Sequence, residues 1–275
     1  MSAVVPDVES ADGLVFGVQD PAVRRRRRTQ WLIYAGRIVL LFVVLSAWQY
    51  FGPRMGEITA SSPLHVYDSL RRLAVSGILW RDLGTTLEEV ILGYLIGSGA
   101  GVVLGTLVAS SVFVAGLLDP FIIGVYGIPK IALGPLLVVW LGINLAPKIA
   151  LAAMLTFFLV FFATYQGIRN VDQATVNAAR LMGASRLQTR RYVIFPGARS
   201  SIFLGLKLGV PEALIGAIVG EFISSSRGIG FQIQYATAQL DTAGVFAGLV
   251  ILTMLSLALN AVVNKASGDN EGVHR

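Results

Sequence analysis

The sequence predicts an all-α membrane protein with six transmembrane helices, on two observations. Of its 275 residues, 55% are hydrophobic and 14% are charged, with a mean hydropathy of +0.70, whereas soluble domains carry about 25% charged residues. In addition, the chain contains apolar stretches long enough to cross roughly 30 Å of hydrocarbon. The predicted spans are residues 31–50, 87–108, 112–128, 149–168, 203–222 and 245–263.

The first span follows a basic tail. Residues 1–30 combine acids, Gly and Pro with the run Arg24–Arg28, a composition that predicts a flexible segment. The stretch 31–50 spans about 20 residues, longer than the roughly 7–15 residues of a secretory signal core, so we predict a span that is retained. Arg37 lies near its start, where its side chain can reach the cytoplasmic headgroups.

The charge distribution predicts the orientation of the chain. The loop 169–199, between the fourth and fifth spans, contains six arginines against the single acid Asp172. The positive-inside rule therefore places this loop in the cytoplasm. Because four spans separate it from Arg24–Arg28, both basic segments can lie on that side. Both termini, including the tail 265–275, are then cytoplasmic, in a multi-pass protein of the cell (inner or plasma) membrane.

One apolar segment is too short to span. Residues 131–142 would reach only ~18 Å as a helix, and Gly134-Pro135 interrupts them. We predict a re-entrant segment at the outer face, whose backbone groups are satisfied by protein or by a water-filled cavity. In the outer loop 52–86, Ser61–Pro63 resembles the N-cap and first turn of a short helix.

Glycines recur along two of the spans. In the second span they are Gly93, Gly97, Gly101 and Gly105, and in the fifth they are Gly205, Gly209, Gly216 and Gly220. Such stripes let another backbone come close, which predicts tight helix packing or, alternatively, a moving interface.

Glu212 lies near the middle of the fifth span, on the face that Gly209 and Gly216 share. A carboxylate at that depth costs at least ~2.5–3.5 kcal/mol, so it should face a cavity or a partner helix. Two interpretations stay open: a substrate-pathway site formed by Glu212 with Gly209 and Gly216, or a structural carboxylate. Lys207 and Glu221, nearer the ends of the span, are predicted to be interfacial anchors.

Several functions are not predicted. The chain has no Cys, and its two histidines, His65 and His274, are too few for a metal cluster. Its arginines adjoin apolar spans, so the net charge of +6 predicts membrane orientation and no nucleic-acid binding. There is no G-x-x-x-x-G-K-[ST] motif and no plausible nucleophile–base pair, so the chain is not predicted to be an enzyme.

The cytoplasmic loop carries a spaced motif. Residues 177–196 read NAARLMGASRLQTRRYVIFP. This stretch resembles the EAA loop of ABC importer permeases, whose pattern is E-A-A, three residues, Gly, nine residues, Ile, any residue, Leu-Pro. The residues at its fixed positions are Asn177, Ala178, Ala179, Gly183, Val193, Phe195 and Pro196. Asn177 replaces the Glu of the pattern, which removes one charge, and Phe195 replaces the Leu.

The resemblance implies a type I ABC importer permease, with a cytoplasmic coupling helix between spans four and five that lies in a groove of an ATPase subunit. Gly183 would let the chain turn, and Pro196 would stop the segment before the fifth span. The residues that the resemblance assigns to ATPase coupling are Asn177, Ala178, Ala179, Leu181, Met182, Gly183, Ala184, Arg186 and Pro196.

The resemblance also implies partners. These are two ABC ATPase subunits, an extracytoplasmic substrate-binding protein, a second permease copy in a homodimer, and membrane lipid. ATP and Mg would bind to the ATPase subunits, and this chain would bind no cofactor.

Residues 61–263 are similar to the nitrate, sulfonate and taurine branch of these permeases, which also includes transporters of thiamine-precursor pyrimidines. The stretches PKIALGPLLVVWLGI and GEFISSSRGIGFQI carry part of this similarity. It implies import of a small polar solute, without deciding which one.

Two other classes of function remain as alternatives. An ion-gradient-driven carrier would need inverted repeats and a relay of ionisable residues, for which Glu212 and Asp119 are candidates. A membrane scaffold would keep the docking helix and need no cavity.

Overall fold

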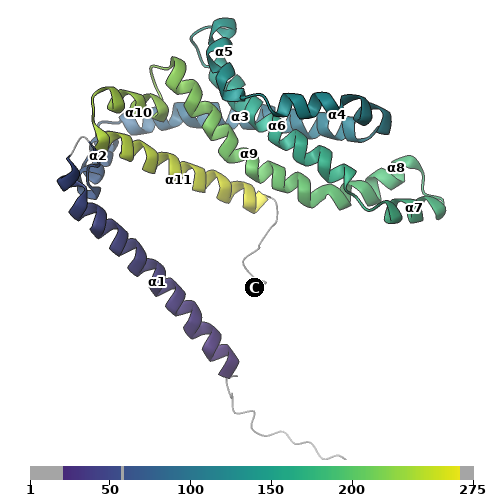
Figure 1. Cartoon of the computed structure of the whole chain (residues 1–275), viewed down its shortest axis with the longest axis horizontal. Helices are drawn as coiled ribbons and strands as arrows, with labels where there is room; N and C mark the ends of the chain where they lie inside the picture. Colours follow the sequence, from purple (N-terminus) through teal and green to yellow (C-terminus); the bar gives the residue numbers. More distant parts are fainter. Residues whose placement is uncertain (1–20, 57–58, 267–275) are drawn as a thin grey trace, which may run out of the picture.

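A computed structural model describes residues 21–56 and 59–266, so residues 1–20 of the predicted tail 1–30 and residues 267–275 of the predicted tail 265–275 lie outside the described residues. Residues 21–30, predicted to be flexible, are helical. Helices are the regular structure throughout that part of the chain (Figure 1). The α-helices are α1 (Pro21–Phe51), α2 (Pro63–Val75), α3 (Ile78–Ala109), α4 (Val112–Tyr126), α5 (Gly134–Leu141), α6 (Ala146–Arg169), α7 (Gln173–Leu181), α8 (Arg186–Thr189), α9 (Phe195–Ser224), α10 (Ile229–Ala238) and α11 (Thr242–Ala266). Shorter segments are the 3-10 turns η1 (Pro53–Met55) and η2 (Lys130–Leu133) and the π-helical turn η3 (Arg190–Ile194).

The long helices α3, α6 and α9 form the centre of the molecule. The glycines of α3 lie against α6, because a Cβ atom at Gly101 would be 2.9 Å from the amide nitrogen of Phe161. One at Gly105 would be 2.9 Å from the carbonyl oxygen of the same residue. Gly93 and Gly97 meet α6 equally closely. The stripe therefore brings two helix backbones together at a spacing that no larger residue allows.

The glycines of α9 also lie against α6. A Cβ atom at Gly216 would be 2.7 Å from the amide nitrogen of Ala152, and one at Gly220 would be 2.9 Å from the Cα of Lys148. Thus α6 is held between two glycine-bearing helices.

Outer helices complete one end of the bundle. Helices α10 and α11 pack together, and α2 lies beside α11. Their contact is apolar, with Ile229, Ile233 and Ile251 buried at its centre. Helix α2 begins as predicted, since the Ser62 side chain accepts a hydrogen bond from the backbone N–H of His65.

Five helical segments of the described chain are long and apolar enough to cross a membrane. The predicted span 112–128 is not among them. Helix α4 has 15 residues with Pro120 inside it, and a helix of that length reaches about 22 Å, short of the roughly 30 Å of hydrocarbon. The predicted short segment 131–142 forms η2 and α5, which pack against α6 and α9. Helix α1 begins at Pro21, before the predicted boundary at residue 31, although its apolar candidate span begins at Gln30.

Helix α1 runs away from the bundle (Figure 1). Its candidate span is 0% buried within the chain. It is attached near its C-terminal end, where the Trp48 ring lies 5.0 Å from that of Phe246 and its Nε1 donates to the carbonyl of Ala60 at 3.0 Å.

Candidate functional site

The loop between α6 and α9 begins with a capped helix. The Asp172 carboxylate accepts hydrogen bonds from the backbone N–H of Ala174 at 3.0 Å and of Thr175 at 3.2 Å. It also accepts from the Thr175 hydroxyl at 2.8 Å, and these bonds, the hydroxyl's first, hold the pKa of Asp172 below its ordinary value. Helix α7 therefore has a defined start at the end of α6, as N-capping requires.

A sharp turn separates α7 from α8. Gly183 has a φ of +87°, in the left-handed region where a side chain is strained. Its N–H donates to the carbonyl of Arg180 at 3.0 Å, which closes the end of α7. Ser185 and Gln188 then form a capping box that starts α8. The coupling helix that the resemblance implies thus consists of two short helices with a corner at Gly183.

The corner presents apolar side chains outward. Leu181 is 89% exposed, Met182 is 88% exposed and Leu187 is 74% exposed. The opposite face of α7 is anchored by Val176, which is 2% exposed. Large apolar groups held out on a polar loop are typical of a protein-binding surface.

The other residues expected to contact the ATPase lie on the same loop. Asn177, Ala178 and Arg186 are exposed, whereas Ala179 and Ala184 are half-buried. These residues are therefore gathered on one loop at the end of the bundle opposite α10 (Figure 1).

The expectation that Pro196 stops the segment before the fifth span is wrong. Pro196 lies in the first turn of α9, and helical structure continues from Arg186 to Ser224 through the π-helical turn η3. A proline is tolerated there because the first turn of a helix needs no N–H donor from it. The loop is consequently joined to α9 through helical structure.

Glu212 lines a cavity of about 260 Å³ between η2, α6 and α9. Lys130 lines the same cavity, and its Nζ lies 5.0 Å from the centre of the Phe158 ring. Gly209 and Gly216, expected beside Glu212 on a pathway, lie in the contact with α6 instead. The cavity thus combines one carboxylate and one ammonium group with apolar walls.

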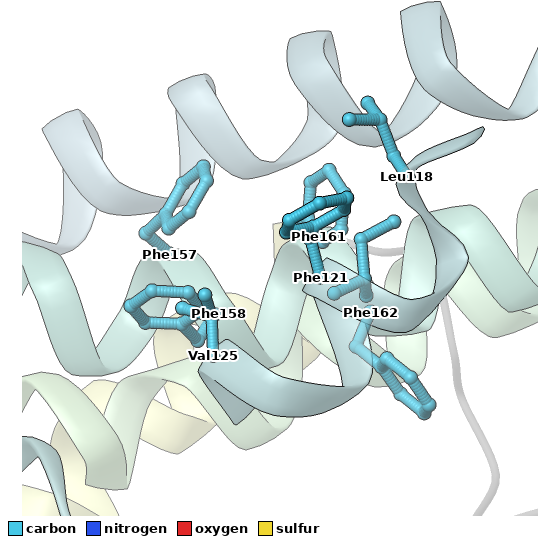
Figure 2. A pocket seen from close by; sticks show the side chains of 8 residues that line it. Leu118, Phe121, Val125, Phe157, Phe158, Phe161 and Phe162 are labelled. Carbon is cyan, nitrogen blue, oxygen red and sulfur yellow. The ribbon is translucent and has the colours of Figure 1, made fainter. Parts of the chain in front are cut away.

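A second cavity, of about 180 Å³, adjoins the first through Phe158, which lines both. Figure 2 shows its phenylalanine side chains, contributed by α4 and α6. Asp119, at the adjacent part of α4, accepts a hydrogen bond from the Tyr165 hydroxyl at 2.9 Å.

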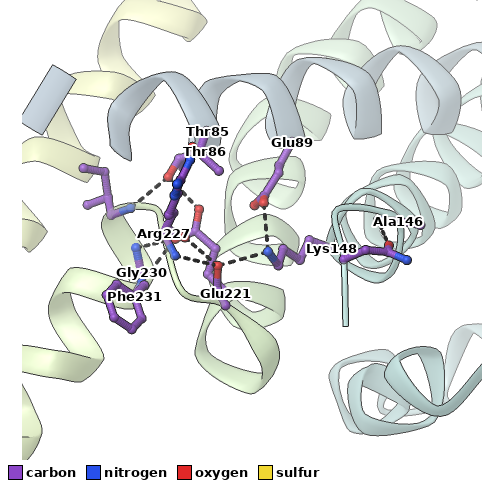
Figure 3. A network of polar contacts seen from close by, with 12 residues as sticks. Thr85, Thr86, Glu89, Ala146, Lys148, Glu221, Arg227, Gly230 and Phe231 are labelled. Atoms are coloured by element: carbon purple, nitrogen blue, oxygen red, sulfur yellow. Dashed lines mark hydrogen bonds and ion pairs between the residues drawn. The ribbon is translucent and has the colours of Figure 1, made fainter. Parts of the chain in front are cut away.

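Glu221 lies at the centre of a buried polar network at the other end of the bundle (Figure 3). One carboxylate oxygen accepts from the Thr86 hydroxyl at 2.6 Å, and the Thr86 oxygen accepts from the N–H of Ile229 at 2.9 Å. The other oxygen accepts from the N–H groups of Gly230 and Phe231. These donors belong to the first turn of α10, which has no partners for them within its own helix.

The expectation that Glu221 is an interfacial anchor is therefore wrong: its side chain is 0% exposed. Lys148 extends the network, since its Nζ lies 3.4 Å from a carboxylate oxygen of buried Glu89 and 3.0 Å from the Ser225 hydroxyl. Sequence reasoning missed this cluster because Glu89, Lys148 and Glu221 each lie near the end of a predicted span. Only the packing of α3, α6 and α9 shows that they meet.

The described residues contain no group of three or more His, Asp or Glu side chains that could hold a metal ion. The arrangement consists of a bundle of membrane-length helices, a cavity with two charged residues beside the middle of α9, and an exposed apolar corner at one end. These features are consistent with a membrane protein of the permease class.

Residues 75–266 match the model of the family described as "Binding-protein-dependent transport system inner membrane component". The chain belongs to this family, and it is a permease component of an ABC importer. ATPase and substrate-binding partners, and a place in the inner membrane, follow from membership of the family.

Two relatives illustrate the similarity. The chain is 32% identical over 248 residues to SsuC of Bacillus subtilis strain 168, named as an aliphatic sulfonates transport permease, with 88% of each chain covered. It is 32% identical over 245 residues to the taurine transport system permease protein TauC of Escherichia coli K12, covering 85% of this chain and 89% of TauC.

The fold is also similar to that of a solved transporter. A chain in the inward-facing MetNI methionine ABC transporter matches with a TM-score of 0.55 and 19% identity, over 74% of this chain and 98% of that one. At this identity the match shows the fold alone.

Proposed function

We propose that this permease works as a homodimer with two ATPase subunits, which bind ATP and Mg and hydrolyse the ATP, and with an extracytoplasmic binding protein that delivers the solute. Both termini and the loop between α6 and α9 lie in the cytoplasm in this proposal, which the six arginines of residues 169–199 support.

The corner between α7 and α8 is the proposed ATPase contact. The observation that carries this proposal is the exposure of Leu181 and Met182, at 89% and 88%, on an otherwise polar loop. The capped start at Asp172 and the turn at Gly183 make the corner stiff. A stiff corner that continues helically into α9 can carry a displacement of the ATPase into the membrane.

Transport would follow by alternating access. When ATP closes the two ATPase subunits, each pulls on the corner of its permease, and this shift rocks the bundle so that the central pathway opens outward. ATP hydrolysis resets it inward. The close glycine contacts of α6 with α3 and α9 favour movement of these helices as rigid bodies.

The cavity with Glu212 and Lys130 is the proposed part of the solute pathway. Its two opposite charges lie near the middle of α9 and beside the start of α5, where an ionisable group requires a partner or a hydrated cavity. A small sulfonate or a zwitterionic aminosulfonate would match one or both charges. The substrates in the names of SsuC and TauC, aliphatic sulfonates and taurine, support this class.

The test replaces Gly183 with Glu. The substitution places a charged side chain in a left-handed turn that has open space around it, so it should abolish ATP-dependent uptake and lower ATPase co-purification while the permease stays in the membrane. Gly77→Glu, at another exposed glycine that has a positive φ of +76° and open space around it, controls for added charge and for backbone strain. Normal uptake by the Gly183→Glu variant would refute the proposed coupling role.

A further inference from the structure

A large cavity lies beside the corner between α7 and α8, at the adjoining ends of the long helices. It has a volume of about 810 Å³ and is lined by the last turn of α3, the end of α6, the start of α9, and α7 and α8. Because α3, α6 and the segment leading into α9 are long enough to span the bilayer, the cavity lies at the depth where lipid headgroups begin.

Four of the six arginines of the loop line this cavity: Arg169, Arg180, Arg186 and Arg190. No acidic residue is among the described side chains that line it. The acid of the loop, Asp172, accepts hydrogen bonds from Ala174 and Thr175 at the start of α7. The positive charge at this cavity is therefore not balanced by its own walls.

The arginines converge on the cavity from different elements, which a simple orientation signal does not require. Arg169 ends α6, Arg180 lies in α7 and Arg190 begins η3. Arg190 is held in place, since its Nη2 donates to the carbonyl oxygen of Ser110 at 3.1 Å. Guanidinium groups fixed around one space suit a phosphate, which accepts paired hydrogen bonds from them.

The rest of the cavity wall is mixed, with polar side chains from Thr106, Ser110, Gln173 and Thr189 and an apolar part. Ile168, Val171 and Ile194 line it beside the arginines. A free phosphate would make no favourable contact with these apolar side chains, whereas a phospholipid presents a charged headgroup joined to acyl chains. Basic pockets between helices at the cytoplasmic surface bind acidic headgroups for this reason.

We propose that this cavity, the arginine cavity, binds the headgroup of an anionic phospholipid of the cytoplasmic leaflet. The cavity shares Ala184 and Arg186 with the residues expected to contact the ATPase, but Leu181 and Met182 do not line it, so a lipid bound there would leave the apolar corner free for the ATPase. A bound lipid would neutralise the arginines and tie the start of α9 to the membrane surface.

The test measures lipid binding to the purified permease by native mass spectrometry with dioleoyl phosphatidylglycerol and dioleoyl phosphatidylcholine. The variant Arg169→Gln/Arg190→Gln removes two cavity arginines. The control Arg191→Gln/Arg199→Gln removes the same charge at two exposed arginines of the same loop that are not among the lining residues. The variant Arg169→Lys/Arg190→Lys keeps the charge, and elution as a single species in size-exclusion chromatography checks folding.

Wild type and the charge-loss control should prefer phosphatidylglycerol, and Arg169→Gln/Arg190→Gln should lose roughly 30-fold in that preference. The Lys variant should keep most of it. Equal loss in the control would overturn the proposal, because it would show a general charge effect. The proposal would also be overturned if inorganic phosphate or glycerophosphoglycerol bound as tightly as the lipid. Release of phosphatidylglycerol when the ATPase binds would overturn it as well, because it would assign the arginines to contact with the ATPase.

Discussion

Replacing Gly97 with Ala should destabilise the permease, although alanine is normally the better helix residue. The new Cβ atom would meet the carbonyl oxygen of Ala153 and would lie 2.9 Å from the Cβ of Thr156. Both are atoms of α6 that cannot rotate away. The matched variant is Gly99→Ala, two residues along the same helix, where a Cβ atom meets nothing within 4 Å.

The pair isolates the packing contribution. Exchange of Gly for Ala favours the helix by about 1 kcal/mol at both positions, so this gain cancels in the comparison. Overpacking a close contact costs roughly 1–3 kcal/mol, which is the expected difference between the two variants. Since 1 kcal/mol shifts the melting temperature of a domain of this size by about 2–4 °C, Gly97→Ala should melt about 2–12 °C below Gly99→Ala.

The assay is thermal unfolding of the purified permease in detergent, followed by intrinsic tryptophan fluorescence. Gly99→Ala should melt at or above the wild-type temperature. If the two variants melted together, the close approach of α3 and α6 at Gly97 would be refuted, and with it the role of the glycine stripe.

Other variants test the polar network and the loop. Lys148→Met should lower the stability of the permease by about 3–5 kcal/mol, because it leaves the buried Glu89 without its cation. The double variant Lys148→Met/Glu89→Leu should recover much of that stability, and no recovery would argue against the ion pair. Glu221→Ala should cost at least about 3 kcal/mol in thermal unfolding, since it strands the Thr86 hydroxyl and two backbone N–H groups, whereas Glu221→Gln should cost less. The Asp172 carboxylate has a lowered pKa, so its cap on α7 is fully present above the ordinary pKa and is lost as pH falls through the lowered value. Hydrogen exchange at the Thr175 amide, corrected for its intrinsic rate, should therefore stay constant through neutral pH and accelerate only in acid. In the Asp172→Ala variant the corrected rate should be fast at every pH. Equal rates in the wild type and the variant would count against the cap.

Much of the fold follows from sequence because membrane spans are long and apolar. The spans at 87–108, 149–168 and 245–263 all lie inside observed helices, since a run of about 20 apolar residues has no other stable form in lipid. Hydropathy does not fix helix ends, however. The predicted span at 203–222 is the C-terminal half of a helical segment that begins at Arg186, because a polar, arginine-rich sequence can be helical without being apolar.

The polar network shows why part of the site could not be predicted. Glu221 follows an apolar stretch, which is also where an interfacial anchor occurs, and the sequence does not say that α10 turns back over it. The donors that make its burial favourable are backbone N–H groups of Gly230 and Phe231. Their only trace in residue type is indirect, in Gly228 and Gly230, where a Cβ atom would meet the Glu221 carboxylate. By contrast, the family motif in the loop could be recognised because Gly183 and Pro196 occupy fixed positions along it.

The most direct test of the central claim is the accessibility of the corner between α7 and α8. The chain contains no cysteine, so Met182→Cys introduces a single thiol at a position that is 88% exposed. A membrane-impermeant maleimide should fail to label it in intact cells and should label it in inside-out vesicles stripped of the ATPase, with protection restored when the ATPase is added back. Labelling from outside intact cells, or labelling that the ATPase does not reduce, would contradict the proposal that this corner joins the permease to its motor.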